Sequence, residues 1–204
     1  MNTGTLPPNI DPQELRAAVR GRYSAVASAP DGPYSFRVGR AFAEALGYPP
    51  ALLEAMPPGA TDAFTGVATP VLQADLRPGE AVLDLGCGGG LDLIIAAEAV
   101  GQTGRAIGID MAEPMVARAG ANLRALRLEQ AEAVVGVAET LPLPDAAVDC
   151  VVANGILNLA PDKSAVLAEV ARVLHRGGRF ILAETTLRHE LPPGEVQGLE
   201  DWFR

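Results

Sequence analysis

Two aspartates enclose a glycine-rich stretch near the middle of the chain. Asp84 and Asp92 lie on either side of Gly86, Gly88 and Gly90. Glycines let a backbone turn tightly and approach a ligand with no side chain in the way. A pyrophosphate bound at such a loop would meet two carboxylates, so the acids favour a ligand that carries positive charge. Taken alone, the glycines would also fit a simple tight turn between a strand and a helix.

The spacing around this loop also argues against a dinucleotide. A dinucleotide fingerprint places its third glycine at the position where this chain has Leu91. Asp110 stands about twenty residues after Gly90, where a carboxylate can accept the ribose hydroxyl protons of a nucleoside. An ammonium, a sulfonium and a ribose are combined in S-adenosylmethionine (SAM), which is therefore the expected cofactor. A nucleotide-dependent oxidoreductase on a similar sheet is the less favoured alternative.

Apolar strands alternate with amphipathic helices in the second part of the chain. The pattern predicts strands at 81–85, 105–109, 133–137, 148–153 and 180–183, and helices at 91–100, 113–126 and 163–174. We expect Gly177 and Gly178 to end the last helix. This alternation is typical of an α/β fold with a doubly wound, mostly parallel sheet. Ligands of such sheets bind at the carboxyl ends of the strands, so functional residues are expected just after residues 85, 110, 137 and 153.

The first 80 residues form a helical leader. Asp11 and Pro12 are typical of a helix start, and further short helices are predicted at 38–46 and 50–55. Prolines divide the segment, and it carries no strand signal. We therefore expect a leader at 1–80, which contributes a lid and the substrate region, and a SAM-binding core at 81–204.

Composition excludes several classes of function. The 204 residues carry a net charge of −9 and no cluster of Lys and Arg, so nucleic acid is not an expected partner. No apolar run reaches the roughly 18–20 residues of a membrane span, and no secretory signal opens the chain. Cys87, Cys150, His175 and His189 show no metal-ligand spacing. The expectation is a cytoplasmic protein without a metal site.

Five segments, in order, resemble motifs of one enzyme superfamily. Residues 82–90 resemble the first motif of class I SAM-dependent methyltransferases, and residues 109–111 resemble their ribose-binding acid with the neighbour that lies along the adenine. Residues 137–145 resemble the loop after the third strand, which contacts adenine. Residues 148–154 resemble the fourth strand, and 172–179 the turn into the fifth.

The resemblance implies a Rossmann-like fold and a SAM cofactor that leaves as S-adenosylhomocysteine. It also implies a small-molecule methyl acceptor. Ala138 contributes through its backbone N–H if Glu139 does not contact the cofactor, Tyr23 is a lid contact, and Cys87 fits a packing role as well. The candidate cofactor-binding residues are Tyr23, Asp84, Gly86, Cys87, Gly88, Asp110, Met111, Ala138, Glu139 and Asn154. The sequence singles out no catalytic base, and a non-catalytic SAM-binding or scaffold protein remains an alternative.

A narrower resemblance points to arsenite methyltransferases. It rests on residues 154–163 and on the leader segments 19–23, 44–48 and 66–70. Enzymes of that family bind trivalent arsenic through cysteine thiolates, soft ligands for a soft centre. Gly155 stands where the family has a loop cysteine, and 66–70 contains none. We therefore expect a relative that methylates a different acceptor.

The end of the sheet predicts an uncovered edge. Domains of this superfamily usually continue after the fifth strand with a helix and an antiparallel hairpin, but twenty residues follow Glu184 here, interrupted by Pro192-Pro193. Leu199, Trp202 and Phe203 resemble a short apolar helix face. We expect a shortened C-terminal end whose fifth strand is covered in a homodimer, with the leader or a longer natural chain as the other candidates.

Overall fold

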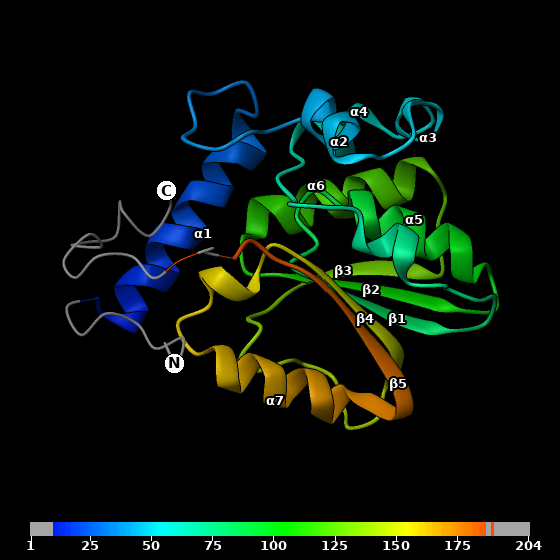
Figure 1. Cartoon of the computed structure of the whole chain (residues 1–204). Coiled ribbons are helices and arrows are strands. Elements are labelled where there is room, and N and C mark those ends of the chain that lie inside the picture. The colour runs from blue at the N-terminus through cyan, green and yellow to red at the C-terminus, as the bar shows by residue number, and fades with distance from the viewer. Residues whose placement is uncertain (1–9, 187–188, 190–204) are drawn as a thin grey trace.

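Five parallel strands form the centre of the molecule in the computed structural model, which describes residues 10–186 and His189. Neighbouring strands pair in the order β3-β2-β1-β4-β5 (Figure 1). The strands are β1 (Ala81–Leu85), β2 (Arg105–Asp110), β3 (Ala131–Val135), β4 (Val148–Asn154) and β5 (Leu174–Ala183). The sequence-based prediction of a doubly wound parallel α/β sheet is therefore confirmed.

Helices cover both faces of this sheet. Helices α5 (Leu91–Val100) and α6 (Glu113–Ala125) lie on one face, and α7 (Lys163–Val173) lies on the other (Figure 1). Helix α7 buries Val166, Val170 and Val173, which recur at helical spacing and so form one apolar stripe. Strand β1 contributes to both cores, because alternate residues of a strand point to opposite faces.

The chain reverses its direction of winding between β1 and β4. From β1 it proceeds outward to β2 and β3, and then returns to place β4 and β5 on the other side of β1. In such a sheet the loops after β1 and β4 diverge and leave a crevice at their carboxyl ends. The predicted functional residues follow these strands, so the topology brings them to one edge of the sheet.

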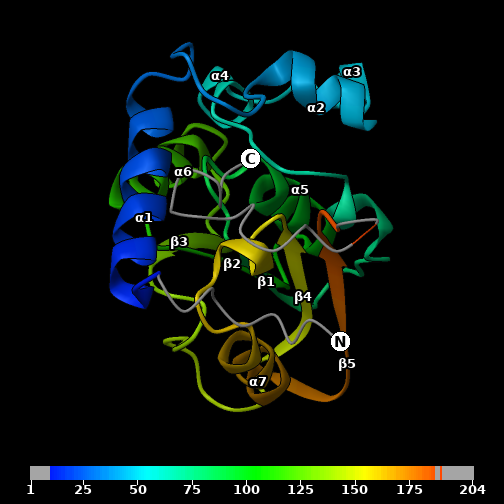
Figure 2. The same cartoon turned by 60° about the vertical axis from the view of Figure 1, so that its left-hand side comes forward.

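The leader is helical and packs onto the core. Its elements are α1 (Pro12–Ser28), α2 (Arg40–Leu46), α3 (Pro50–Glu54), α4 (Pro58–Asp62) and the 3₁₀ turn η1 (Pro70–Gln73). Asp11 caps α1 as predicted, because its carboxylate accepts from the backbone N–H groups of Gln13 (2.7 Å) and Glu14 (3.1 Å). Figure 2 shows α1 standing alongside the sheet near α6.

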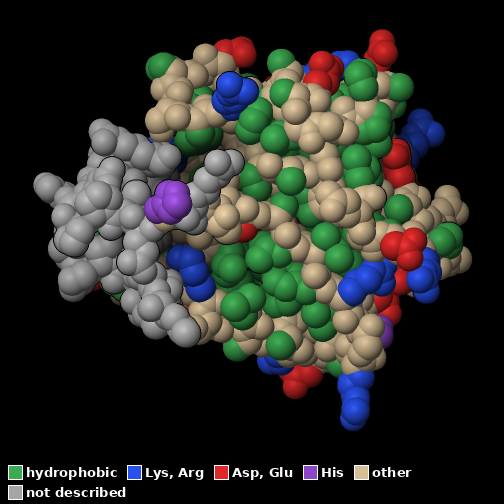
Figure 3. All heavy atoms as spheres, viewed as in Figure 1, with side chains coloured by type: hydrophobic (Ala, Val, Ile, Leu, Met, Phe, Trp, Pro, Cys, Tyr) green, Lys and Arg blue, Asp and Glu red, His purple; other side chains and the backbone are tan. Residues whose placement is uncertain are grey.

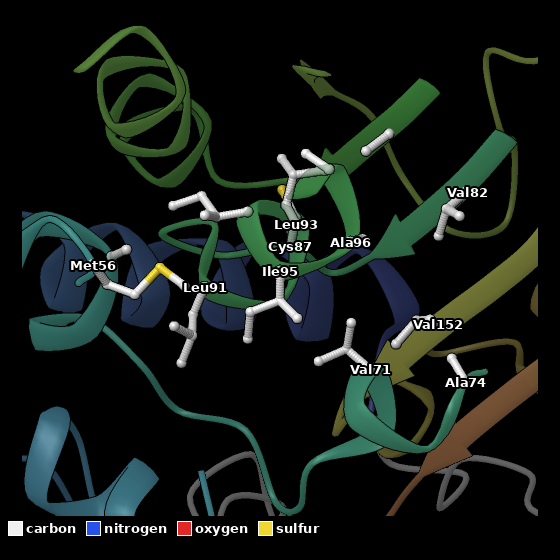
Figure 4. Close-up of a cluster of buried hydrophobic side chains, with 14 of the residues drawn as sticks. Met56, Val71, Ala74, Val82, Cys87, Leu91, Leu93, Ile95, Ala96 and Val152 are labelled. Atoms are coloured by element: carbon white, nitrogen blue, oxygen red, sulfur yellow. The ribbon is translucent and has the colours of Figure 1, made fainter. Parts of the chain in front are cut away.

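Leader and core share one hydrophobic cluster. Figure 4 shows Met56 and Val71 of the leader together with Leu91 and Ile95 of α5 and Val152 of β4. These side chains are all at most 8% exposed. The leader is thus integrated into the packing of the core, and its position relative to the strand ends is fixed by burial of apolar surface.

Two predicted boundaries were wrong. Helix α7 ends at Val173, and Gly177 and Gly178 lie inside β5 instead of ending the helix. Pairing with β4 explains why the helix ends earlier, since Leu174 already pairs with Val148. The residues from there to Gly178 form an irregular segment of the strand, in which Gly177 has φ +87°.

Strand β3 begins and ends two residues earlier than predicted. It pairs with β2 from Ala131 opposite Ala106 to Val135 opposite Asp110. Val137, which was predicted to lie in the strand, instead forms an isolated antiparallel bridge with Thr140. The chain therefore turns at Gly136, and the loop that follows reaches the edge of the sheet where β2 ends.

Strand β5 is an outer strand of the described sheet, as predicted. Leu182 on β5 is 38% exposed and Leu72 of η1 is 41% exposed. Hydrophobic side chains gather in the middle of the face shown in Figure 3, which is the face that β5 crosses in Figure 1. The predicted apolar helix face with Leu199, Trp202 and Phe203 lies outside the described residues.

Candidate functional site

A cavity opens where β1, β2 and β4 end. It holds about 720 Å³ of empty space, counted to its open mouth. Eight of the ten predicted cofactor-binding residues line it: Tyr23, Gly86, Gly88, Asp110, Met111, Ala138, Glu139 and Asn154. Segments far apart in the sequence thus meet at the edge that the strand pattern predicted.

A second, smaller cavity of about 360 Å³ adjoins the first. The two share Thr65, Gly86, Gly88 and Asn154. The other two predicted residues, Asp84 and Cys87, line this second cavity. The larger cavity has an apolar lining with a few polar groups, as sites for small organic ligands do.

The glycine loop after β1 lines both cavities. Gly86 and Gly88 have φ values of +77° and +50°, which side-chain-bearing residues rarely adopt. A Cβ on Gly86 would lie 2.0 Å from Ile156 Cγ2, so the loop after β4 can approach only a glycine here. Gly88 has no neighbour within 4 Å of an added Cβ, which leaves its backbone open to a ligand.

Asp110 holds the glycine loop and the start of α6 together. One carboxylate oxygen accepts from the Gly88 N–H at 2.9 Å, and the other accepts from the Ala112 N–H at 2.8 Å. Burial raises the pKa of Asp110, while hydrogen bonds from these backbone N–H groups oppose that rise. Each oxygen keeps capacity for a further hydrogen bond, so the side chain can still accept ribose hydroxyls.

Asp84 is the unusual polar group of the site. It is 2% exposed, and among the described residues its Oδ2 atom has no hydrogen-bond partner. Burial raises the pKa of Asp84 well above its ordinary value, and the charges of Asp92 and Asp110 raise it further. A buried carboxylate oxygen without a partner is costly, and a positively charged ligand group in the second cavity would satisfy it. The residues present therefore fit the ammonium end of SAM.

Asn154 joins the end of β4 to the leader. Its side-chain oxygen accepts from the N–H groups of Val67 (2.7 Å) and Ala68 (3.2 Å), and its amide donates to the Ala68 carbonyl (2.9 Å). The same amide donates to Asp92 Oδ2 at 3.0 Å. Asn154 thus fixes the leader segment that borders both cavities.

Glu139 forms an ion pair with Arg16 of α1. Its Oε1 atom lies 3.0 Å from Arg16 Nη2, and its side chain is only 7% exposed. Arg16 was not among the predicted residues, because nothing in its sequence position distinguishes it from the other arginines of α1. Val19 and Tyr23 of α1 line the larger cavity. The ion pair between Arg16 and Glu139 therefore holds α1 at one side of the opening.

Neither cysteine presents a reactive thiol. Cys87 and Cys150 are 6% and 0% exposed and belong to the hydrophobic cluster. Burial raises the pKa of Cys87 well above its ordinary value and that of Cys150 to about 11. The backbone of Cys87 borders the second cavity, but its sulfur packs against Gly108 of β2, where an added Cβ would lie 2.7 Å away.

The described residues form neither a metal-ligand cluster nor a membrane-spanning helix. Over residues 10–186 and His189, no group of three or more His, Cys, Asp or Glu side chains is arranged to hold a metal ion. In the same part of the chain, no helix has the length and apolar character needed to cross a bilayer.

Comparison with known proteins identifies the class. A family model described as a methyltransferase domain matches residues 76–204, and the chain belongs to this family. This confirms the resemblance to class I SAM-dependent methyltransferases that the motifs indicated.

Three relatives illustrate the range of the family. An arsenite methyltransferase of Halobacterium salinarum is 34% identical over 202 residues, which cover 92% of this chain and 51% of the relative. A demethylmenaquinone methyltransferase of Bacillus cereus is 38% identical over 112 residues, or 55% of this chain and 47% of the relative. The solved structure of an arsenic(III) SAM methyltransferase from Chlamydomonas reinhardtii is 32% identical, with a TM-score of 0.54, and the match covers 69% of this chain and 46% of that one. The chain thus spans about half the length of each.

Proposed function

We propose that the protein binds SAM across the two adjoining cavities and transfers its methyl group to a small organic molecule. The observation that carries this proposal is the placement of two carboxylates beside one glycine loop, Asp84 in β1 just before the loop and Asp110 at the end of β2. Asp110 borders the larger cavity, and Asp84, whose Oδ2 atom has no partner among the described residues, lines the second. A ligand with ribose hydroxyls at one end and an ammonium at the other satisfies both.

Seven of the ten predicted residues then have a definite task. Asp110 accepts the ribose hydroxyls, and Met111 and Ala138 border the adenine. The open backbone at Gly86 and Gly88 lets the cofactor approach the loop, and Asp84 faces the charged amino end. Tyr23, carried by α1, covers the opening.

The chemistry that SAM supplies when bound is a methyl group on a positively charged sulfur, already activated for in-line displacement. The protein's own part is to hold the acceptor within roughly 3–3.5 Å of that carbon, in line with the bond that breaks, and to exclude water. Tyr23, Thr65 and Ile156 line the part of the cavity between α1 and the loop after β4. We assign no catalytic base to this site.

The acceptor is proposed to be organic and not trivalent arsenic. Both thiols of the chain are buried in the hydrophobic cluster, and burial raises the pKa of each, so neither favours the thiolate form that binds trivalent arsenic. Gly155 has φ +78°, and a Cβ there would lie 3.1 Å from Val67 Cγ1. The position where the arsenite branch has a cysteine is therefore shaped for glycine in this chain.

Further aspects of the proposal concern assembly and location. We propose a cytoplasmic homodimer in which a second copy covers the β5 edge and its exposed Leu182. The net charge of −9 disfavours nucleic acid as a partner.

Calorimetric titration with SAM, S-adenosylhomocysteine and NAD⁺ tests the cofactor. Binding of the first two without NAD⁺ supports the proposal, and selective binding of NAD⁺ would identify an oxidoreductase. Release of S-adenosylhomocysteine in a screen of organic acceptors then separates an enzyme from a SAM-binding scaffold. Arsenite with glutathione serves as the comparison acceptor.

A further inference from the structure

Two carboxylates line the second cavity, and they differ in how they are bonded. Asp92, at the start of α5, has both oxygens occupied: Tyr48 donates its hydroxyl to Oδ1 at 2.5 Å, and Asn154 donates to Oδ2 at 3.0 Å. Asp84, at the end of β1, receives the Leu93 N–H but keeps Oδ2 without a partner among the described residues. One acid therefore has both oxygens hydrogen-bonded to neighbours, and the other keeps one buried oxygen without a partner among the described residues.

Acidic and neutral groups surround this pair. Asp110 contributes a third carboxylate from β2, and the Cys87 thiol and Tyr48 hydroxyl are neutral because burial raises the pKa of both. Among the described residues, no Lys, Arg or His side chain lines the cavity. Arg118 of α6, which passes close to Gly89, directs its guanidinium at the Gly59 and Ala27 carbonyl oxygens.

When no cation is present, burial favours the protonated form of both acids relative to an ordinary carboxyl group. Burial raises the pKa of Asp92 to about 6, although the hydrogen bonds from Tyr48 and Asn154 oppose the rise. The repulsion between Asp84 and Asp92 means that they titrate as a pair. A cation placed between them would favour the ionised form of both and displace a proton.

Tyr48 connects this pair to the leader. It stands between α2 and α3, is 1% exposed, and packs its ring edge-on against Phe64 with centroids 5.3 Å apart. Asn154 contacts Asp92 and the leader segment at Val67 and Ala68 at the same time. The position of the leader and the ionisation of Asp92 thus depend on the same hydrogen bonds of Tyr48 and Asn154.

We propose that Tyr48 is a positioning residue for the cofactor, which holds Asp92 in place beside Asp84 in the second cavity, so that cofactor binding is coupled to proton release. This inference rests on the proposed function, since it assumes that the ammonium of SAM enters this cavity. It assigns to the leader a direct part in cofactor affinity.

The test measures binding and not turnover. S-adenosylhomocysteine, which carries the same ammonium, is titrated calorimetrically between pH 5.5 and 7.5 in two buffers of different ionisation enthalpy, which gives the protons released. This window stays below the roughly 7.7–8.0 at which an α-amino group itself titrates. The wild type should release a fraction of a proton, and its affinity should rise with pH.

Tyr48→Phe is the diagnostic variant, because it keeps the ring that packs on Phe64. Loss of the hydroxyl should raise the pKa of Asp92, weaken binding by about tenfold at the acid end of the range, and move the pH dependence upward. Tyr34→Phe is the matched control, since its hydroxyl donates to the Ala29 carbonyl in an exposed turn, and it should bind as the wild type does.

Asp92→Asn is a second variant for the same titration. It should bind with less proton release, because one of the two titrating groups is gone. Equal affinity and the same pH profile for wild type and Tyr48→Phe would overturn the inference, as would a loss of equal size at every pH. Absence of proton release in the wild type would overturn it without any variant. A wild type that binds neither SAM nor S-adenosylhomocysteine would instead contradict the proposed function.

Discussion

Replacing Asp110 by Asn removes one charge from the larger cavity and changes little else. The carboxylate accepts from the N–H groups of Gly88 (2.9 Å) and Ala112 (2.8 Å). An amide offers a single acceptor oxygen, so one of these two donors would face an NH₂ group. The neutral side chain is also cheaper to bury than the carboxylate, whose pKa is raised by desolvation. These opposing effects leave a net loss of stability of about 1 kcal/mol, and a domain of ordinary stability remains folded after a loss of that size.

The effect on the cofactor should be larger than the effect on the fold. In the proposed complex the ribose hydroxyls donate to a charged acceptor, and hydrogen bonds of this kind contribute about 1.5–3 kcal/mol. Asn retains one acceptor, so the expected loss of SAM binding is about 1–3 kcal/mol, or roughly 5- to 150-fold in Kd. The Asp110→Ala variant should lose binding in the same range, with a greater cost to the loop because both N–H groups lose their partner.

Calorimetric titration with SAM, supported by circular dichroism and a melting curve, measures both effects. Asp75→Asn is the matched control, because its side chain is 80% exposed in an ion pair with Arg77 and its φ of +46° suits Asn. The control should bind SAM as the wild type does. Unchanged SAM affinity in a folded Asp110→Asn protein would refute the assignment of Asp110 to the ribose.

Four further outcomes are expected. Arg16→Gln should speed SAM dissociation several-fold in stopped-flow experiments with little change in Tm, because partly exposed ion pairs contribute only about 0–1 kcal/mol to stability; an unchanged off-rate would exclude α1 as a lid. Purified protein with SAM, glutathione and arsenite should yield no methylated arsenic by mass spectrometry, and its detection would overturn the proposal of an organic acceptor. The hydrogen bonds from Arg172 lower the pKa of Glu169 from 4.5 to about 2, so this pair stabilises the fold above pH 4.5 and the contribution is lost as pH falls toward 2. Glu169→Gln should flatten that acid loss in denaturation curves, and an identical slope would refute this origin. Sedimentation should show a dimer at micromolar concentration that Leu182→Lys dissociates, whereas a monomeric wild type would reject the interface.

The central strands and the glycine loop could be predicted because their signals are local. Strand β1 and helix α5 have the predicted bounds, and Asp11 caps α1 as expected. Apolar runs, glycines and capping residues act over a few positions, so they can be recognised without knowledge of the fold. The position of Asp110 at the end of β2 follows from the same reasoning.

Other features depend on contacts that form only in the folded chain. Glycines 177 and 178 signal a helix end locally, but the pairing of β5 with β4 determines their conformation. The contacts of Arg16 with Glu139 and of Tyr48 with Asp92 join residues 123 and 44 positions apart. Tyr48 could have been noticed in the sequence, since it is a lone tyrosine in a short leader loop. Its contact with Asp92 could not, because tertiary packing determines that contact.

Native mass spectrometry of the purified protein tests the central claim most directly. The structure predicts a protein that carries SAM or S-adenosylhomocysteine from its expression host, or that takes up one cofactor per chain when SAM is added. The same spectra should show no adduct with NAD⁺ at equal concentration, because Asp84 and Asp92 border the loop that a pyrophosphate would need. A protein that binds NAD⁺ and leaves SAM free would contradict the account.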